Sequence, residues 1–414
     1  MKKARVMAAK VLFLSLFVAG VYLLRTSEVS ARTIATDVNE AAAGNVLMGI
    51  EGAYKEAPSS YVKRINEIRR EACEEGYRDP RDTTRSLTMQ DYVPIKWSSD
   101  LQYIARIRAA EAAVYNSHTR PNGNSCFSIS SKNQVVSSAE VLAWGGDGID
   151  LWYAERDAWS KNEKKVTSHY ECLINPNNRY MAISYFYSKN GIRNSTYAGE
   201  FSGEDVLDSD YLIAESDVLQ KVEVQLSKVG TYHIMSPNDA YVINKGAYKR
   251  LRVKAMVNYK GGTSRLNYLG NVSWTSSKPK HVRVDENGRV WGIRYGSSVI
   301  FATFDGEVIK QKIRVRPTLK TIYLRHLTPG HGRVKVVWKK GNRKATGYQI
   351  QYSRSSKFSS MSRTILVRGR NREHKIIRKL SSGHTYYFRI RSFKKVGGKK
   401  FFSAWSFTGN VKVS

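Results

Sequence analysis

The chain has 414 residues, of which 41% are apolar and 25 are tyrosines. This length exceeds that of one ordinary domain, so we expect two to four domains with hydrophobic cores, and the composition excludes an intrinsically disordered protein. The formal net charge is +33, from 68 basic and 35 acidic residues, and a charge of this size predicts attraction to anionic partners.

The N-terminal residues 1–31 have the pattern of a signal peptide. Four basic residues precede an apolar stretch over 11–24, and residues 29–31 read Val-Ser-Ala, a small-residue cleavage site. The alternative is an uncleaved membrane anchor, because Arg25 directly follows the apolar stretch, although a span needs about 20 apolar residues. We therefore expect an extracellular protein, either secreted or associated with the cell surface.

Several elements of the first half follow from apolar spacing. Residues 32–56 are rich in alanine and glycine without a clear period, and we interpret them as a linker. Helical spacing of apolar residues predicts helices over 57–76, 99–117 and 149–162. In the third helix, Glu155 would share a face with two neighbouring tryptophans.

A predicted β-hairpin follows these helices. Residues 180–188 alternate like a strand, Asn190-Gly191 is typical of a hairpin turn, and 194–201 would be the return strand. The acidic segment 206–219 is interpreted as a linker or a short helix.

The remainder of the chain has the pattern of β-sandwiches. Short β-type segments separated by turn signals occur over 220–315 and again over 317–414, with Pro317 at the joint, and no long helical stripe interrupts them. We therefore expect two all-β domains after the mixed first half.

The positive charge is concentrated at the C-terminal end. Residues 57–205 carry 19 basic and 19 acidic residues, 220–315 carry 17 and 6, and 316–414 carry 25 and 1. The last segment is expected to bind polyanions in a strongly salt-dependent manner.

Three polyanions have the required charge: wall polymers such as teichoic acid, acidic polysaccharide, and nucleic acid. Export favours cell-envelope polymers. Nucleic acid is disfavoured because Tyr348, Tyr386 and Trp405 match core positions of a sandwich and would be unavailable for stacking on bases. The alternative is a basic surface that only keeps the protein soluble.

Four residues are candidates for a functional site: His118, Glu140, Glu155 and His169. Imidazole and carboxylate groups bind metals and transfer protons near neutral pH. We expect the four to lie within about 10 Å of one another in one concave site, with His118 and His169 as ligands of a divalent metal, of which zinc suits the donors best. The alternative is a hydrogen-bonded cluster that ties loops together.

The same four residues lie in four motifs. Residues 117–123 read Ser-His-Thr-Arg-Pro-Asn-Gly, 139–145 read Ala-Glu-Val-Leu-Ala-Trp-Gly, 152–155 read Trp-Tyr-Ala-Glu, and 168–170 read Ser-His-Tyr. Through these motifs, residues 57–205 resemble the CAP superfamily of cysteine-rich secretory, antigen 5 and pathogenesis-related proteins, in its bacterial secreted branch.

The resemblance implies a three-layer α-β-α sandwich with an open cleft. The family's His/Glu tetrad falls on His118, Glu140, Glu155 and His169, and metal binding between its two histidines recurs in the family. The chain departs from the family pattern at Val141 and Cys172, where asparagine is common. Loss of these amides removes hydrogen bonds that would orient the site.

The two β domains also resemble known modules. Residues 220–315 resemble a bacterial Ig-like group 2 module. Residues 317–414 resemble a fibronectin type III domain through Trp338, the Gly347-Tyr348 pair, the strand over 386–391 and Trp405-Ser406. The expected fold is therefore multidomain: an α+β CAP sandwich followed by two all-β Ig-like sandwiches.

The expected function is binding rather than catalysis. CAP proteins are described variously as proteases, lipid or sterol carriers, and secreted binding proteins. No Gly-x-Ser-x-Gly motif is present, so hydrolysis would have to use an activated water. Two alternatives are a metal-assisted hydrolase acting on wall peptide or protein, and a lipid-binding protein or adhesin with a lipid or peptide in the cleft.

The chain has three cysteines, Cys73, Cys126 and Cys172. Cys126 and Cys172 each follow one of the two site histidines closely, so they would approach each other if the histidines converge. An exported protein could oxidise such a pair. The alternative is a set of buried thiols.

Overall fold

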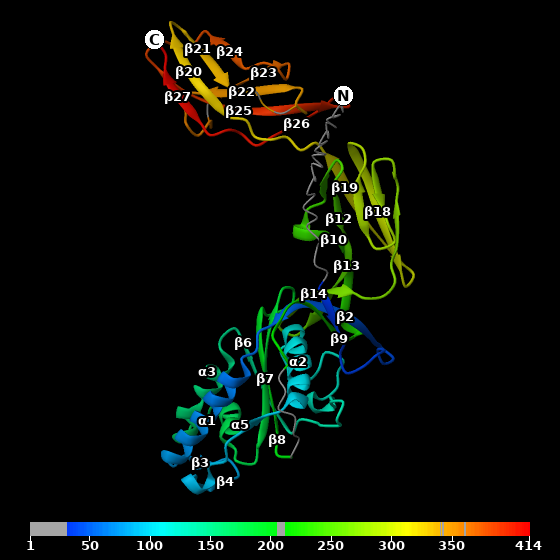
Figure 1. Cartoon of the computed structure of the whole chain (residues 1–414), viewed down its shortest axis with the longest axis vertical. Helices are drawn as coiled ribbons and strands as arrows, with labels where there is room; N and C mark the ends of the chain where they lie inside the picture. The colour runs from blue at the N-terminus through cyan, green and yellow to red at the C-terminus, as the bar shows by residue number, and fades with distance from the viewer. Residues whose placement is uncertain (1–30, 205–211, 340, 342, 360–361) are drawn as a thin grey trace, which may run out of the picture.

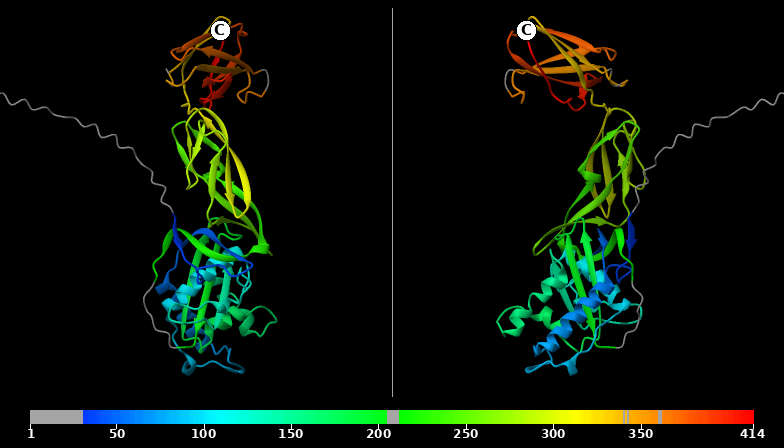
Figure 2. Two further views of the ribbon diagram at one scale, coloured as in Figure 1. Left: turned by 90° about the vertical axis from the view of Figure 1, so that its right-hand side faces the viewer. Right: turned by 60° about the vertical axis from the view of Figure 1, so that its left-hand side comes forward.

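The computed structural model describes residues 31–204, 212–339, 341, 343–359 and 362–414. The described chain forms three units that follow one another along the long axis of the molecule (Figure 1 and Figure 2). We call them the head (residues 32–204), the middle region (residues 212–316) and the tail domain (residues 317–414). The predicted signal peptide lies outside the described residues, apart from its last residue.

Within the part of the chain that the structure describes, no helix combines the length and the apolarity needed to cross a membrane.

The head has three layers. Strands β7, β8 and β6 are antiparallel neighbours in its sheet, and β6 is the edge strand. Helices α1, α3 and α5 lie on one face and α2 lies on the other (Figure 1). The bounds are α1 Pro58–Glu74, α2 Ser99–Val114, α3 Gly148–Tyr153, α5 Ser168–Ile174, β6 Ala139–Trp144, β7 Tyr180–Ser188 and β8 Ser195–Ser202. The predicted hairpin over 180–201 is confirmed.

Several short elements complete the head. They are β3 Arg78–Asp79, β4 Asp82–Ser86, the 3-10 turn Met89–Asp91, β5 Lys96–Trp97 and the 3-10 turn Cys126–Ser128. β5 pairs in parallel with β7, which extends the sheet on that side.

Two of the three predicted helices are confirmed. The helix predicted over 57–76 is α1, with Ile65, Ile68 and Ala72 fully buried. The helix predicted over 99–117 is α2, and the Ser98 side chain caps it by accepting a hydrogen bond from the backbone N–H of Leu101. α2 ends at Val114, three residues before the predicted end.

The single helix predicted over 149–162 is wrong. The segment forms two short helices, α3 and α4 (Arg156–Ser160), and Glu155 lies at the break between them. The Glu155 carboxylate accepts backbone N–H groups of His169 and Tyr170, at 3.0 and 3.2 Å. These groups belong to the first turn of α5, which has no side-chain cap of its own. The break thus places Glu155 where it caps α5.

The linker predicted over 32–56 is wrong. It contains β1 (Arg32–Ile34) and β2 (Asn45–Tyr54), and β2 joins the sheet of the head through β7. Met48 and Ile50 are fully buried. A strand that is covered on both faces has no polar–apolar alternation, so its sequence gives no period of two.

Gly52 permits the contact between β2 and β7. A Cβ at Gly52 would lie 2.3 Å from Phe186 Cζ and 2.6 Å from the carbonyl oxygen of Tyr187. Any larger residue would push β2 away from β7.

The acidic linker predicted over 206–219 is corrected in part. Residues 205–211 lie outside the described residues, and Glu215–Gln225 is strand β9. β9 pairs with β2 in antiparallel register from Asn45 opposite Gln225 to Tyr54 opposite Glu215. It also pairs in parallel with β1. The two segments that enter and leave the head are therefore hydrogen-bonded to each other.

The middle region is all-β, as predicted, but it shares a sheet with the head. β10 (Val229–Met235), β13 (Arg252–Tyr259) and β14 (Gly262–Tyr268) continue the sheet, because β14 pairs with β2. A domain boundary at residues 219 and 220 would cut through β9.

Two smaller sheets build the rest of the middle region, with strand orders β11-β19-β18-β15 and β12-β17-β16. Their bounds are β11 Val242–Asn244, β12 Tyr248–Arg250, β15 Ser273–Ser276, β16 Val282–Val284, β17 Arg289–Gly292, β18 Gly296–Phe304 and β19 Glu307–Arg316.

The tail domain packs two antiparallel sheets around Trp338, Tyr348, Phe388 and Ile390. One sheet has the order β20-β21-β24, and the other has the order β23-β22-β25-β26 with β27 on β25. Their bounds are β20 Leu324–Gly330, β21 Arg333–Trp338, β22 Gly347–Ser353, β23 Arg363–Arg368, β24 His374–Arg378, β25 Thr385–Val396, β26 Lys399–Phe402 and β27 Gly409–Lys412.

Candidate functional site

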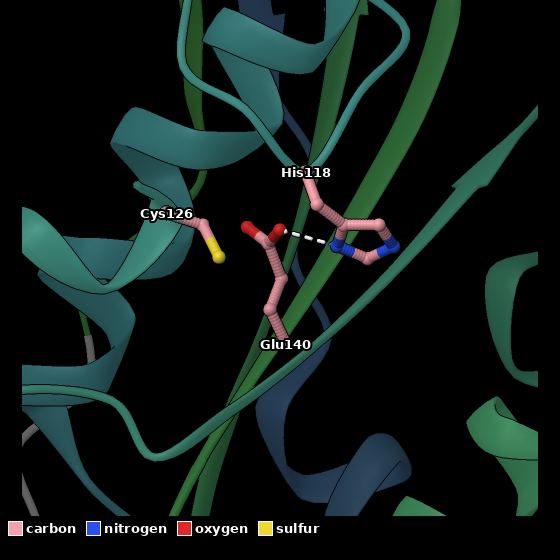
Figure 3. A group of neighbouring side chains, drawn as sticks. All are labelled: His118, Cys126 and Glu140. Atoms are coloured by element: carbon pink, nitrogen blue, oxygen red, sulfur yellow. Dashed lines mark hydrogen bonds and ion pairs between the residues drawn. The ribbon is translucent and has the colours of Figure 1, made fainter. Parts of the chain in front are cut away.

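The first candidate histidine pairs with the first candidate glutamate. His118 Nδ1 lies 2.7 Å from Glu140 Oε1, and the imidazole side chain is 55% exposed while the carboxylate is buried. His118 follows α2 on a loop, and Glu140 lies on the edge strand β6. The imidazole edge that carries Nε2 points away from Glu140 (Figure 3). The carboxylate therefore orients the ring and leaves Nε2 accessible.

Glu140 is held in place by Arg108 from α2. Arg108 Nε donates to Glu140 Oε2 at 2.5 Å, and Arg108 Nη1 donates to Glu111 Oε2 at 2.8 Å. The guanidinium is fully buried and also donates to the backbone carbonyl of Ser117 at 3.1 Å. Burial raises the pKa of Glu140, but the hydrogen bond from His118 and the charge of Arg108 outweigh it and hold the pKa below its usual value.

A second carboxyl group lies beside Glu140. Glu200 on β8 is the cross-strand neighbour of Glu140, and it is fully buried. Burial and the nearby negative charge of Glu140 raise the pKa of Glu200 well above its usual value. The protonated form of Glu200 is therefore favoured beside the carboxylate of Glu140.

Cys126 joins this group. The ligand atoms of His118, Cys126 and Glu140 lie within 4.8 Å of one another, and the carboxylate lies between the sulfur and the imidazole (Figure 3). Burial and the charge of Glu140 raise the pKa of Cys126 to about 12. The thiol is therefore protonated, and an adjacent carboxylate gives it none of the activation that a catalytic cysteine receives from an imidazolium.

The second candidate histidine pairs with the second candidate glutamate. His169 Nδ1 lies 2.6 Å from Glu155 Oε1, while the other carboxylate oxygen caps α5. The side chains of His169 and Glu155 are 23% and 16% exposed. As in the first pair, the carboxylate binds Nδ1, and Nε2 has no hydrogen-bond partner among the described residues.

The two His–Glu pairs lie in different layers of the head. On β6, Glu140 contacts α2 through Arg108, whereas the next residue, Val141, packs in the cluster that holds Trp152 and Tyr170. His169 belongs to α5, in the layer of α1 and α3. α5 also packs against β6. The pairs thus lie on elements that adjoin the edge strand, and convergence of all four residues in one cleft stays a prediction.

The described cysteines are all free, and Cys73 and Cys126 are buried. Burial raises the pKa of the Cys172 thiol to about 11. The structure thus contains three thiols and no Cys126–Cys172 bond.

The buried ion pairs beneath the site are not predicted by the sequence patterns. Arg120 donates to Asp37 at 2.6 Å and to Glu111 at 2.8 Å, so the loop of His118 is fixed both to α2 and to the segment before β2. A signal was available in α2, where Arg106, Arg108 and Glu111 occur among the apolar residues of a buried helix. Buried charges at such positions require partners.

Residues 62–199 match the model of the cysteine-rich secretory protein family, CAP. This segment is a CAP domain. The match covers all four candidate residues, which the structure joins as His118–Glu140 and His169–Glu155. The CAP part of the predicted fold is thereby confirmed, together with an all-β C-terminal region.

The other comparisons add little to the CAP assignment. No curated protein matches the chain. One solved structure, titled "Myokine structure", is 18% identical and covers 22% of this chain and 90% of its own, with a TM-score of 0.18. The solution structure of the fn3 domain of human collagen alpha-1(XX) chain is 22% identical and covers 23% of this chain and 82% of its own, with a TM-score of 0.18. At these scores neither likeness bears on the fold, and the Ig-like and fibronectin assignments stay predictions.

Proposed function

We propose that this is an extracellular bacterial binding protein. Its CAP domain would hold a ligand or a divalent metal at His118 and His169, and its tail domain would attach the protein to anionic polymers of the cell envelope. The secretory character named in the matching family and the signal-peptide pattern of residues 1–31 support the location.

One observation carries the proposal for the CAP domain: both imidazoles are bound by a carboxylate at Nδ1. A carboxylate that accepts from Nδ1–H fixes the tautomer in which Nε2 carries a lone pair. Two such nitrogens are good donors for zinc, and the paired carboxylate increases their basicity.

The His118–Cys126–Glu140 group is a poorer metal site. The Glu140 carboxylate is already bound by the guanidinium of Arg108, and the Cys126 thiol is protonated at neutral pH. A cation bound there would lie near the positive charge of Arg108. We therefore propose that any metal is bound by the Nε2 atoms of His118 and His169, which requires the predicted convergence of the two His–Glu pairs in one cleft.

The first test is zinc binding by the full chain. Isothermal titration calorimetry should show one zinc site that is lost in His118→Ala and in His169→Ala. The loss should exceed the roughly 10- to 100-fold weakening that removal of an orienting carboxylate causes.

The control variant is Cys126→Ser, which should bind zinc as the wild type does. If Cys126→Ser and His118→Ala lose binding while His169→Ala keeps it, the metal belongs to the thiol group instead. Equal binding by all variants would rule out a metal role for both histidines.

The proposal for the tail domain rests on unpaired charge. Glu373 is the one acidic residue in 316–414. On the sheet β20-β21-β24, Arg333, Lys335 and Arg378 are exposed and form no ion pair within the described residues. Arg333 and Arg378 are direct cross-strand neighbours. Like charges in this position are destabilising, so a bound polyanion would stabilise the face.

The second test is attachment to an anionic wall polymer. Replacing Arg333, Lys335 and Arg378 together with glutamate should weaken binding of the full chain to teichoic acid by at least tenfold at 0.1 M salt. Binding of the wild type should fall steeply toward 1 M salt, because the Debye length shrinks from about 10 Å to about 3 Å.

The matched control changes the same total charge on the head. Lys132, Lys161 and Lys164 are exposed, and glutamate at these three positions should leave attachment nearly unchanged. If both triple variants lose binding equally, net charge rather than the tail domain determines attachment, and the anchor proposal fails.

A further inference from the structure

A cavity of about 690 Å³ lies where the head meets the middle region. Strand β2 and the turn after β7 line it from the head, and β13 and β14 line it from the middle region. This volume is within the usual range for small-molecule sites, about 300–1,000 Å³. None of the four His/Glu residues lines it.

The cavity is rich in cationic side chains. Its lining holds five basic residues and three acidic ones, which leaves an excess of two positive charges. The five basic residues are Lys189, Arg250, Arg252, Lys254 and Arg265. The net charge predicts an anionic ligand.

Part of this charge is already neutralised. Arg252 and Lys254 share one carboxylate, that of Glu51, at 3.3 and 3.0 Å. Asn267 donates to the same carboxylate at 2.9 Å, so Glu51 is fixed across the joint between the two units. Lys189 forms an ion pair with Asp217.

Two arginines and one carboxylate, that of Asp239, are left over. Arg250 and Arg265 form no ion pair or side-chain hydrogen bond within the part of the chain that the structure describes. Arg250 is half-buried and comes from the end of β12, and Arg265 is exposed on β14. Guanidinium groups present a planar fork of donors that matches a phosphate group better than a lysine ammonium does.

We propose that this cavity binds a phosphate-bearing anion through Arg250 and Arg265, with Arg252 and Lys254 adding positive potential beside it. The ligand is either inorganic phosphate or a phosphate ester, since both present the same dianionic group. Because the lining comes from two units, a bound anion would also strengthen the joint between the head and the middle region.

The experiment is calorimetry of the full chain with inorganic phosphate and, separately, with glycerol 3-phosphate, at constant ionic strength. We expect one saturable site for at least one of the two. Arg250→Gln combined with Arg265→Gln should weaken it at least tenfold. The stronger of the two probes identifies the source of the phosphate group.

The matched control is Arg325→Gln combined with Arg333→Gln, which removes the same charge from the tail domain and should change the affinity less than twofold. This control separates the cavity from the proposed polymer attachment by the tail domain. If the double variant does not fold, Arg265→Gln alone replaces it in the test, because Arg265 is exposed and its substitution should not disturb folding. Absence of saturable binding up to about 10 mM, or an equal loss in both double variants, would overturn the proposal.

Discussion

Replacing Arg108 with methionine is expected to destabilise the protein by about 3–5 kcal/mol, the usual result of removing one partner from a buried ion pair. The guanidinium is fully buried and pairs with Glu140 and Glu111, both of which have fully buried side chains. Methionine fills similar space but has no positive charge, so the buried carboxylates of Glu140 and Glu111 lose the ion pairs that offset their desolvation.

The effect should extend to the candidate site, because Arg108 also donates to the carbonyls of Ser117 and His118. Urea denaturation monitored by tryptophan fluorescence measures the stability change. Lys165→Met is the matched control, because the Lys165 side chain is 70% exposed, and it should leave the midpoint unchanged. A midpoint for Arg108→Met equal to that of the control would show that the buried ion pairs contribute nothing to stability.

Replacing Glu200 with glutamine is expected to stabilise the protein at pH 7 by about 1–3 kcal/mol, and to leave it unchanged near pH 4. The pKa of Glu200 is raised in the folded state. Below the unfolded-state pKa both states hold the proton, so Glu200 does not make stability depend on pH. Above it, the unfolded state loses the proton while the folded state keeps it.

Stability of the wild type should therefore fall as pH rises through this window, by up to about 1.4 kcal/mol per pH unit. Glutamine keeps the shape, does not titrate, and has an amide that can donate to Glu140. Unfolding free energies at pH 4, 5, 6 and 7 test this, with the exposed Glu67→Gln as the control. A difference between wild type and Glu200→Gln that does not grow with pH would show that Glu200 is ionised in the folded protein.

The sequence predicted those features that depend on local pattern. α1, α2 and the hairpin of β7 and β8 have clear periods or a clear turn, and all three are found. Each candidate histidine contacts a candidate glutamate, whereas the convergence of all four residues in one cleft stays a prediction.

The sequence predictions are wrong or missing where contacts between residues far apart in the chain determine the structure. Residues 45–54 have the composition of a linker but form β2, because partners far away in the sequence, including β9, pair with them and bury them. The helix over 149–162 breaks because Glu155 caps α5, a contact that spacing along the chain does not reveal. Glu200 was missed because its environment depends on the register between β6 and β8.

The shared sheet has a consequence for how the protein unfolds. The segment that matches the CAP family begins at residue 62 and therefore leaves out β2. Tyr54, the last residue of β2, packs on Phe186 of β7, with 4.9 Å between the two ring centroids. A piece cut at the family boundaries would expose Phe186 and leave one edge of β7 without its partner, which favours aggregation. β2 also packs with residues of β9 and β13, such as Val222 and Ala255, in one cluster. We therefore expect the head and the middle region to unfold together in heat denaturation, and the tail domain, with its own core, to unfold separately.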